Sequence, residues 1–173
     1  MKKQIFLKWF ILGLAIAINL FILIQAFING EASAKESNSV AQTTADVINT
    51  IKPQTITEQN FDTFAYLLRK LVGHFGCFVI SGVFSTWSFV LFLKDKKVGY
   101  ILWQLLITFT FGLTMALLSE FIQLFISGRT FNFGDVGIDI AGYFIGDFLV
   151  ILLLFLKKSK IFSKQNYTKK QAN

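Results

Sequence analysis

The sequence has 173 residues, of which 54% are hydrophobic and only 16% are charged. An ordinary soluble domain is about a quarter charged, so the composition excludes that class and indicates an all-α integral membrane protein. The formal net charge of +7 would suggest nucleic-acid binding in a soluble chain, but the lysines cluster beside apolar runs, where they act as topology signals. We therefore expect membrane lipids, and not nucleic acid, as partners.

The first predicted element is a transmembrane helix within residues 1–28. A basic start precedes an apolar stretch from Trp9 to Ile28. About 20 such residues are enough to span roughly 30 Å of hydrocarbon. A cleaved signal peptide is the alternative, because Ala32-Ser33-Ala34 resembles a cleavage site. The apolar stretch is longer than the usual 7 to 15 or so residues of a signal peptide, which favours an uncleaved anchor.

Residues 29–60 are rich in Ser, Thr, Asn, Gln and Ala and contain the only proline, Pro53. We find no strong periodicity, so this segment is predicted to be a solvated, partly flexible extracytoplasmic loop. From Asn60 onward, Phe61, Phe64 and Leu68 recur at three- and four-residue spacing. This pattern predicts an amphipathic helix that leads into the next span.

The second transmembrane helix is predicted at residues 71–93. Small side chains recur at every fourth position along it, at Gly73, Cys77, Ser81 and Ser85. Such a face lets another helix approach closely, so we expect a packing seam here. The single cysteine lies in this apolar run, which excludes an intramolecular disulfide and a thiol-rich metal site. We expect no metal and no cofactor.

The third transmembrane helix is predicted at residues 98–127, after the basic connection at 94–97. Its small residues also recur at every fourth position, at Thr108, Gly112 and Ala116. The next member of this series is the acid Glu120, and Gln123 follows at i+3. The packing face of this helix is therefore predicted to lead directly to a polar edge.

The fourth transmembrane helix is predicted at residues 136–156. Asp135 and Asp139 lie one turn apart at its start. Gly142 and Gly146 continue the same face as a close-packing pair.

The distribution of positive charge predicts the topology of this bundle of about four helices. Of the 17 lysine and arginine residues, twelve lie in the N-terminal segment, the connection at 94–97 and residues 157–173. Cytoplasmic segments carry such an excess, so both termini are predicted to be cytoplasmic. Residues 157–173 would then form a basic cytoplasmic tail that faces anionic lipids.

A cluster of polar residues is expected to converge in the outer leaflet, as a ligand-binding or a structural unit. Its members are His74, Glu120, Gln123, Arg129, Asp135 and Asp139. Arg129 lies in a short turn, so a charge-assisted pair with Asp135 is the simplest arrangement. Helix capping and hydrogen bonds across the bundle are the structural alternative. The acids outnumber the arginine, which favours a pocket for a polar or cationic group, or a proton-sharing pair.

These residues resemble the signature of the VanZ-like membrane proteins, a family named for a teicoplanin-resistance protein. The matching positions are Glu120-x-x-Gln123, Gly128-Arg129, Asp135, Asp139, Gly142 and Gly146, with His74 after Arg69 and Lys70. The similarity covers residues 60–156, which are predicted to form a VanZ-like domain. Many members have Asn at the position of Asp139, so this chain carries an additional negative charge there.

The resemblance implies a multi-pass protein of the cell membrane in a Gram-positive bacterium, with a role in antibiotic resistance to glycopeptides such as teicoplanin or to lipoglycopeptides. Our first hypothesis is a binding protein whose outer pocket takes a lipid head group, a lipid-linked wall precursor or the drug. The alternative is an intramembrane hydrolase or transferase that acts on a lipid-linked wall precursor, with Glu120 or His74 as the general base. The sequence has no G-x-S-x-G, HExxH or phosphate-loop motif, which favours binding over catalysis.

Overall fold

The structure is a computed structural model that describes residues 2–93 and 100–171, with side chains for 2–93 and 103–156. Every element in these ranges is helical: α1 (Lys2–Ala26), α2 (Gly30–Ile51), α3 (Glu58–Leu68), the π-helix η1 (Arg69–Gly76), α4 (Cys77–Phe92), α5 (Tyr100–Gln123) and α6 (Phe133–Gln171). The predicted basic connection at 94–97 lies outside the described residues.

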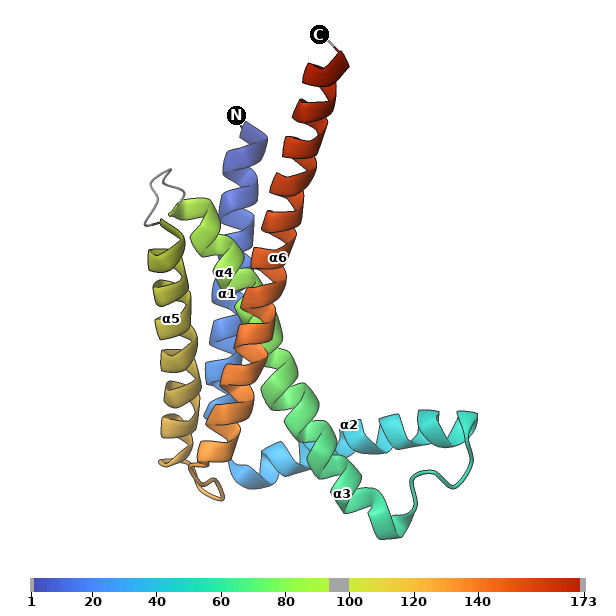
Figure 1. Ribbon diagram of the computed structural model, residues 1–173. Helices are drawn as coiled ribbons and strands as arrows, with labels where there is room; N and C mark the ends of the chain where they lie inside the picture. The colour runs from blue at the N-terminus through green and yellow to red at the C-terminus, as the bar shows by residue number, and fades with distance from the viewer. Residues whose placement is uncertain (1, 94–99, 172–173) are drawn as a thin grey trace.

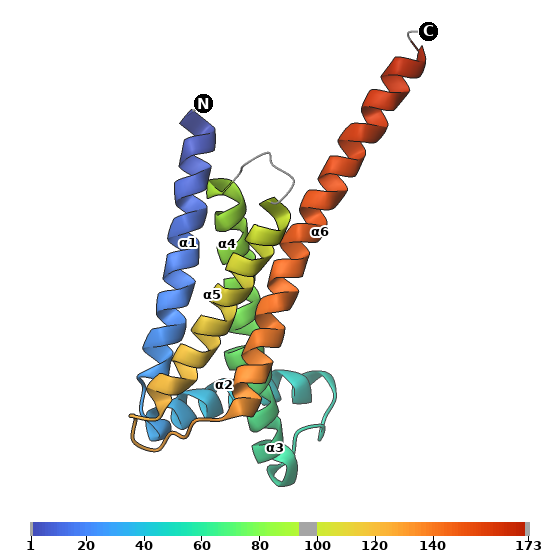
Figure 2. The same cartoon turned by 60° about the vertical axis from the view of Figure 1, so that its left-hand side comes forward.

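Within the described residues, four stretches of helix are long and apolar enough to cross a membrane, which confirms the predicted all-helical membrane fold. They are Lys2–Ala26, Glu58–Phe92, Trp103–Gln123 and Phe133–Leu156. Helices α1, α4, α5 and α6 form a bundle, and the start of α1 and the end of α6 lie at the same end of it (Figure 1). Figures 1 and 2 agree that α2 and α3 lie at the opposite end, where α2 runs outward across the bundle.

Helix α1 is a packed member of this bundle. Its buried side chains form one stripe, which consists of Ile11, Ala15, Asn19, Ile22 and Ala26. The Asn19 amide donates to Ser85 Oγ at 3.0 Å and accepts from Ser81 Oγ at 2.9 Å. A polar side chain within hydrocarbon needs such partners, so these bonds align α1 with the small face of α4.

The prediction of a flexible loop at 29–60 is wrong over Gly30–Ile51, which form α2. The Asn29 side chain caps this helix by accepting from the Ala32 backbone N–H at 2.8 Å. Many of its Ser and Thr hydroxyls bond the carbonyl one turn back, as Thr44 does to Val40 at 2.8 Å. The weak signal that the sequence analysis missed is a small face repeating every four residues, at Ser33, Ser37, Ala41 and Ala45.

The predicted close packing at glycines is present between α6 and the η1–α4 helix, and we call this contact the glycine seam. One of its predicted members, Gly73, does not take part in it. A methyl group at Gly142 would overlap the carbonyl oxygen of Phe75, and one at Gly146 would overlap that of Val79. Gly112 lies against the Tyr143 ring. Gly73, by contrast, is exposed. A methyl group added there would have the Arg69 side chain as its nearest neighbour, at 4.0 Å.

The close partner on the other helix is Gly82, which faces the backbone of Tyr143. It takes the place that the sequence analysis assigned to Gly73. Gly73 itself lies within the π-helix η1, which adds a residue to the local turn, so the register of the predicted seam does not continue back through it.

Two predicted helix boundaries also change. Helix α5 ends at Gln123 and not at Ser127, because the backbone N–H groups of residues 124–126 bond three residues back, which tightens the last turn. Gly128 then takes a left-handed φ of 72° that favours glycine. Helix α6 begins at Phe133 and its backbone stays helical through Gln171, beyond the predicted end of the span.

We predict that Gly146→Ala destabilises the bundle, because its methyl group would meet Val83 N at 2.8 Å as well as the Val79 carbonyl. Overpacking of this kind costs about 1–3 kcal/mol in free energy of unfolding. The measurement is denaturant unfolding of the full chain in detergent micelles. Gly137→Ala is the matched control on the same helix, since nothing lies within 4 Å of the added carbon there. Equal stability of the two variants would contradict the contact.

Candidate functional site

The first part of the site is a polar ladder between η1 and the start of α6. Lys70 and His74 lie one turn apart on η1, and Asp135 and Asp139 lie one turn apart on α6. Lys70 Nζ forms an ion pair with Asp135 Oδ1. His74 Nδ1 lies 3.1 Å from Asp139 Oδ1, and His74 Nε2 lies 3.7 Å from Asp135 Oδ2. Both ring nitrogens of the histidine therefore face carboxylates.

The close approach of the two helices explains this ladder. Gly142 brings α6 against the carbonyl of Phe75, one residue after His74. The helix formed by η1 and α4 runs in the same direction as α6 in Figure 1. Successive turns of one helix therefore face successive turns of the other, Lys70 facing Asp135 and His74 facing Asp139. A π-helical turn is uncommon and is often found at functional sites, and η1 carries two residues of this candidate site.

The second part of the site comes from α5. Glu120 is fully buried at 0% exposure, one turn before the end of the helix. Gln123 Nε2 donates to Glu120 Oε1 at 2.6 Å, and the backbone N–H of Asn132 donates to Glu120 Oε2 at 3.1 Å. Asn132 also accepts the first backbone N–H bonds of α6 through its own oxygen atoms. The acid thus joins the end of α5 to the start of α6.

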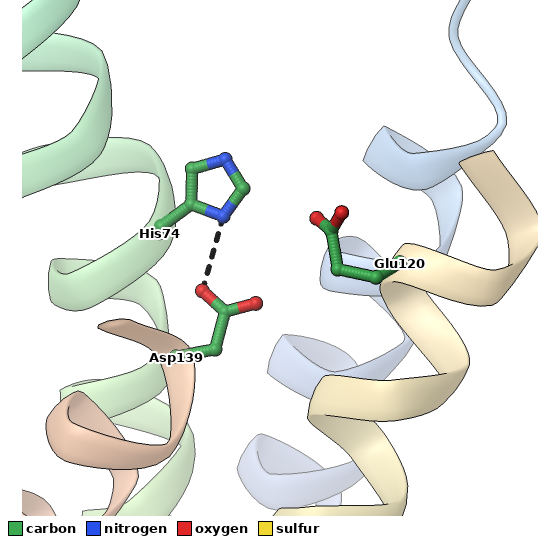
Figure 3. A group of neighbouring side chains, drawn as sticks. All are labelled: His74, Glu120 and Asp139. Carbon is green, nitrogen blue, oxygen red and sulfur yellow. Dashed lines mark hydrogen bonds and ion pairs between the residues drawn. The ribbon is translucent and has the colours of Figure 1, made fainter. Parts of the chain in front are cut away.

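The two parts meet at three side chains. His74, Glu120 and Asp139 each offer one ligand-type atom, and these atoms lie within 4.8 Å of one another. Figure 3 shows Glu120 on α5 pointing across a gap toward the His74–Asp139 pair. The second carboxylate oxygen of Asp139, Oδ2, is buried and has no hydrogen-bond partner. Its carboxylate is only 1% exposed.

Arg129 does not pair with Asp135, so that prediction is wrong. Its guanidinium donates to the carbonyl oxygens of Ile28 at 3.2 Å and Gln25 at 3.4 Å, and to Gln123 Oε1 at 3.1 Å. These carbonyls lie at the C-terminal end of α1, where a cation complements the helix dipole. Lys70 is the actual partner of Asp135.

The turn that carries Arg129 is held against the start of α2. The Gly30 N–H donates to the Ser127 carbonyl at 2.9 Å. A methyl group on Gly30 would overlap the backbone of Gly128, so the two segments touch. Burial, and then the neighbouring charge of Arg69, lowers the pKa of Arg129 below its usual value. A guanidinium remains charged nonetheless, because its ordinary pKa exceeds about 12.

A cavity of about 340 Å³ lies between α2 and the end of the bundle. Its apolar lining consists mainly of Phe21, Ile22, Val40, Leu68, Val72 and Phe78. Its polar lining includes Gln25, Glu36, Arg69, His74, Gln123, Arg129 and Asp139. The volume falls within the roughly 300–1,000 Å³ of small-molecule sites.

The structure therefore brings all of the predicted cluster to one end of the bundle, with different partners from those expected. His74, Gln123, Arg129 and Asp139 line the cavity. Glu120 and Asp135 lie behind this wall, bonded to Gln123 and Lys70.

Sequence reasoning missed the roles of Arg69 and Lys70, and the contribution of α2 to the cavity, whereas Asn132 caps a helix end as the structural alternative expected. The two cations were visible only as the residues before His74 in the family resemblance. The segment that forms α2 was predicted to be a loop, so the sequence analysis did not expect it to line the site.

Comparison with known proteins gives a match over most of the chain. The sequence profile of the family described as VanZ/LLP1 matches residues 9–156, which include most of α1, all of α2 and every residue of the cluster. No curated protein and no solved structure matches the chain.

We predict that Arg129→Ala lowers the free energy of unfolding by about 1.5–3 kcal/mol, because it removes charge-assisted bonds and leaves buried acceptors unpaired. Thermal or denaturant unfolding of the full chain in detergent measures this. Arg69→Ala is the matched control: Arg69 also lines the cavity but takes part in none of the hydrogen bonds or ion pairs found among the described side chains. We expect it to stay within about 0.5 kcal/mol of the wild type. Equal losses would contradict the capping role.

Proposed function

The chain belongs to the VanZ/LLP1 family, and from this premise we propose that it binds the phosphate-bearing head group of a membrane lipid or lipid-linked wall precursor. The binding site is the cavity between α2 and the bundle. By the charge-based topology, this cavity lies in the outer leaflet of the cell membrane. The proposed consequence is protection of the envelope against glycopeptides such as teicoplanin.

The observation that carries this proposal is the mixed lining of the cavity. Its apolar part comes from α1, α2, α3, η1 and α4, with Phe21, Val40 and Val72 among its residues. Its polar part includes the guanidinium groups of Arg69 and Arg129. A lipid has the same division, with hydrocarbon attached to a charged head group, so the lining matches an amphiphile better than a wholly polar solute.

The arginines retain capacity for a ligand. None of the three ion pairs among the described side chains involves Arg69 or Arg129. A guanidinium has five N–H donors, and Arg129 uses three of its own in contacts with the chain. The fork geometry of arginine suits phosphate oxygens, and two converging cations favour an anion between them.

A link to glycopeptide resistance is supported by the family resemblance and by the predicted side of the membrane. Glycopeptides bind wall precursors at the outer surface. A protein that holds a lipid-linked precursor, another anionic lipid or the drug itself there would change the access of the drug to its target. This mode of action does not require the protein to alter the precursor chemically.

The alternative, an intramembrane hydrolase or transferase, has one observation in its favour. His74 is oriented by a carboxylate, as a general base often is. However, its second nitrogen also lies near a carboxylate, that of Asp135 at 3.7 Å, so a substrate proton would compete with two acids for the ring. Glu120 likewise accepts hydrogen bonds on both oxygens. The arrangement supports binding more directly than acid–base catalysis.

We predict that Arg69→Gln weakens binding of phosphate-bearing lipids about tenfold, the roughly 1.4 kcal/mol expected for one charge-assisted contact. Native mass spectrometry of the full chain in detergent would compare phosphatidylglycerol, undecaprenyl diphosphate and teicoplanin, with phosphatidylcholine as the reference lipid. Comparison of phosphatidylglycerol with undecaprenyl diphosphate shows whether the site prefers a bulk membrane lipid or the lipid carrier of wall precursors. Lys35→Gln removes a cation of α2 that does not line the cavity, so it should bind as the wild type does. Equal affinities of the two variants would refute the proposed site.

We also expect the chain to raise the teicoplanin concentration that inhibits a sensitive Gram-positive host. Arg69→Gln should lose this protection and Lys35→Gln should keep it, when all three proteins are matched for amount in the membrane. Protection that survives Arg69→Gln would separate the resistance role from the cavity. Absence of protection by the wild type would count against the resistance role itself.

A further inference from the structure

The buried carboxylates near His74 are not fully compensated by the protein. Glu120 and Asp139 are 0% and 1% exposed, and burying ionised groups without a counter-charge is costly. Among the described side chains, His74 is the only basic group that contacts either acid. Lys70 is bound to Asp135, and Arg129 is directed to the end of α1 and to Gln123.

Two independent features point to a ligand in the gap between these side chains. The first is the convergence of three donor atoms, from His74, Glu120 and Asp139, within 4.8 Å of one another. The second is Asp139 Oδ2, which is buried without a partner. Figure 3 shows this oxygen and the Glu120 carboxylate directed into the same gap. A buried acceptor without a donor needs an explanation, and a cation supplies one.

We infer that His74, Glu120 and Asp139 bind a divalent transition-metal cation of the Zn²⁺ or Mn²⁺ class. Bonds to such ions from nitrogen and carboxylate oxygen are about 2.0–2.2 Å, so neighbouring ligand atoms on one tetrahedral ion lie roughly 3.3–3.6 Å apart. The three atoms lie within 4.8 Å of one another, so side-chain shifts of up to about an ångström would bring them to such positions. The inference replaces the earlier expectation that the chain holds no metal.

The donor set selects the class of metal. Imidazole suits zinc and iron and carboxylate suits manganese, whereas calcium and magnesium prefer sites built of oxygen atoms alone. Two carboxylates and a neutral imidazole would offset the charge of one divalent ion. The hydrogen bonds from Gln123 and Asn132 to Glu120 would orient this ligand, as outer-shell partners do at metal sites.

Three protein ligands leave at least one coordination position open. His74 and Asp139 are part of the cavity wall, so the open position would face the cavity. Water would occupy it in the absence of other ligands. This step rests on the proposed lipid binding: a phosphate oxygen of the head group would take this place, in the cavity that the two arginines also line.

The test uses the purified full chain in detergent, stripped with a chelator and with no phospholipid probe added. Titration with MnCl₂ is followed by the electron paramagnetic resonance signal of free Mn²⁺, and Zn²⁺ content after dialysis is measured by mass spectrometry. We expect one ion per chain in the wild type. Outer-shell changes alone cost about 10–100-fold in metal affinity, so loss of a ligand in Glu120→Gln should cost at least about 100-fold.

Asp147→Asn is the matched control. Asp147 is another buried acid of α6, but it accepts from Thr86 Oγ1 at 2.7 Å, away from the cluster. We expect this variant to bind the metal as the wild type does. His74→Ala provides a second test of ligand loss in case Glu120→Gln folds poorly.

A thermal-unfolding shift in Zn²⁺ should appear in the wild type and in Asp147→Asn only. A wild type that retains no ion, or a Glu120→Gln variant that binds as tightly as the wild type, would overturn the inference. The assay uses neither lipid nor the arginines. Its failure would therefore be distinct from failure of the lipid-binding proposal.

Discussion

Buried carboxylates on one face of α6 set the main constraint in this structure. A helix that crosses hydrocarbon tolerates ionisable side chains only where partners are supplied from within the protein. Asp135, Asp139 and Asp147 are all buried on this helix. Lys70, His74 and Thr86 supply their partners, and all three belong to the η1–α4 helix. The polar contacts thus require the first part of α6 to lie against the η1–α4 helix.

Close packing makes these polar contacts possible. Gly82, Gly142 and Gly146 lie where any larger side chain would overlap the backbone of the facing helix. Without that approach, the short side chains of the acids would not reach their partners. In a membrane, helix association depends on such packing and on hydrogen bonds, because lipid is as apolar as the helix surfaces. The glycine seam and the polar ladder therefore act as one unit.

The proposed binding site arises where this unit meets α1, α2 and α5. Arg129 fastens the turn between α5 and α6 to the end of α1, and the start of α2 lies against the same turn. Helix α2 then covers one side of a cavity whose opposite side ends at His74 and Asp139. In the two proposals made above, the arginines of the cavity would face an anionic head group and the buried carboxylates would face a metal ion. A phosphate bridged to the protein by both would satisfy each kind of charge, since phosphate oxygens bind arginine and divalent cations alike.

The sequence by itself determined the membrane class, the four apolar spans, the small faces of α5 and α6 and the identity of the polar cluster. These properties follow from composition and from helical periodicity, which are local along the chain. The same reasoning failed for α2, whose Ser- and Thr-rich composition is typical of loops but whose hydroxyls bond the helix backbone one turn back.

Only the tertiary structure decided the partners within the cluster: Arg129 with the end of α1, and Asp135 with Lys70. Which charges pair depends on the register between helices. The π-helical turn of η1 changes that register, and pairing rules based on sequence distance contain no information about it.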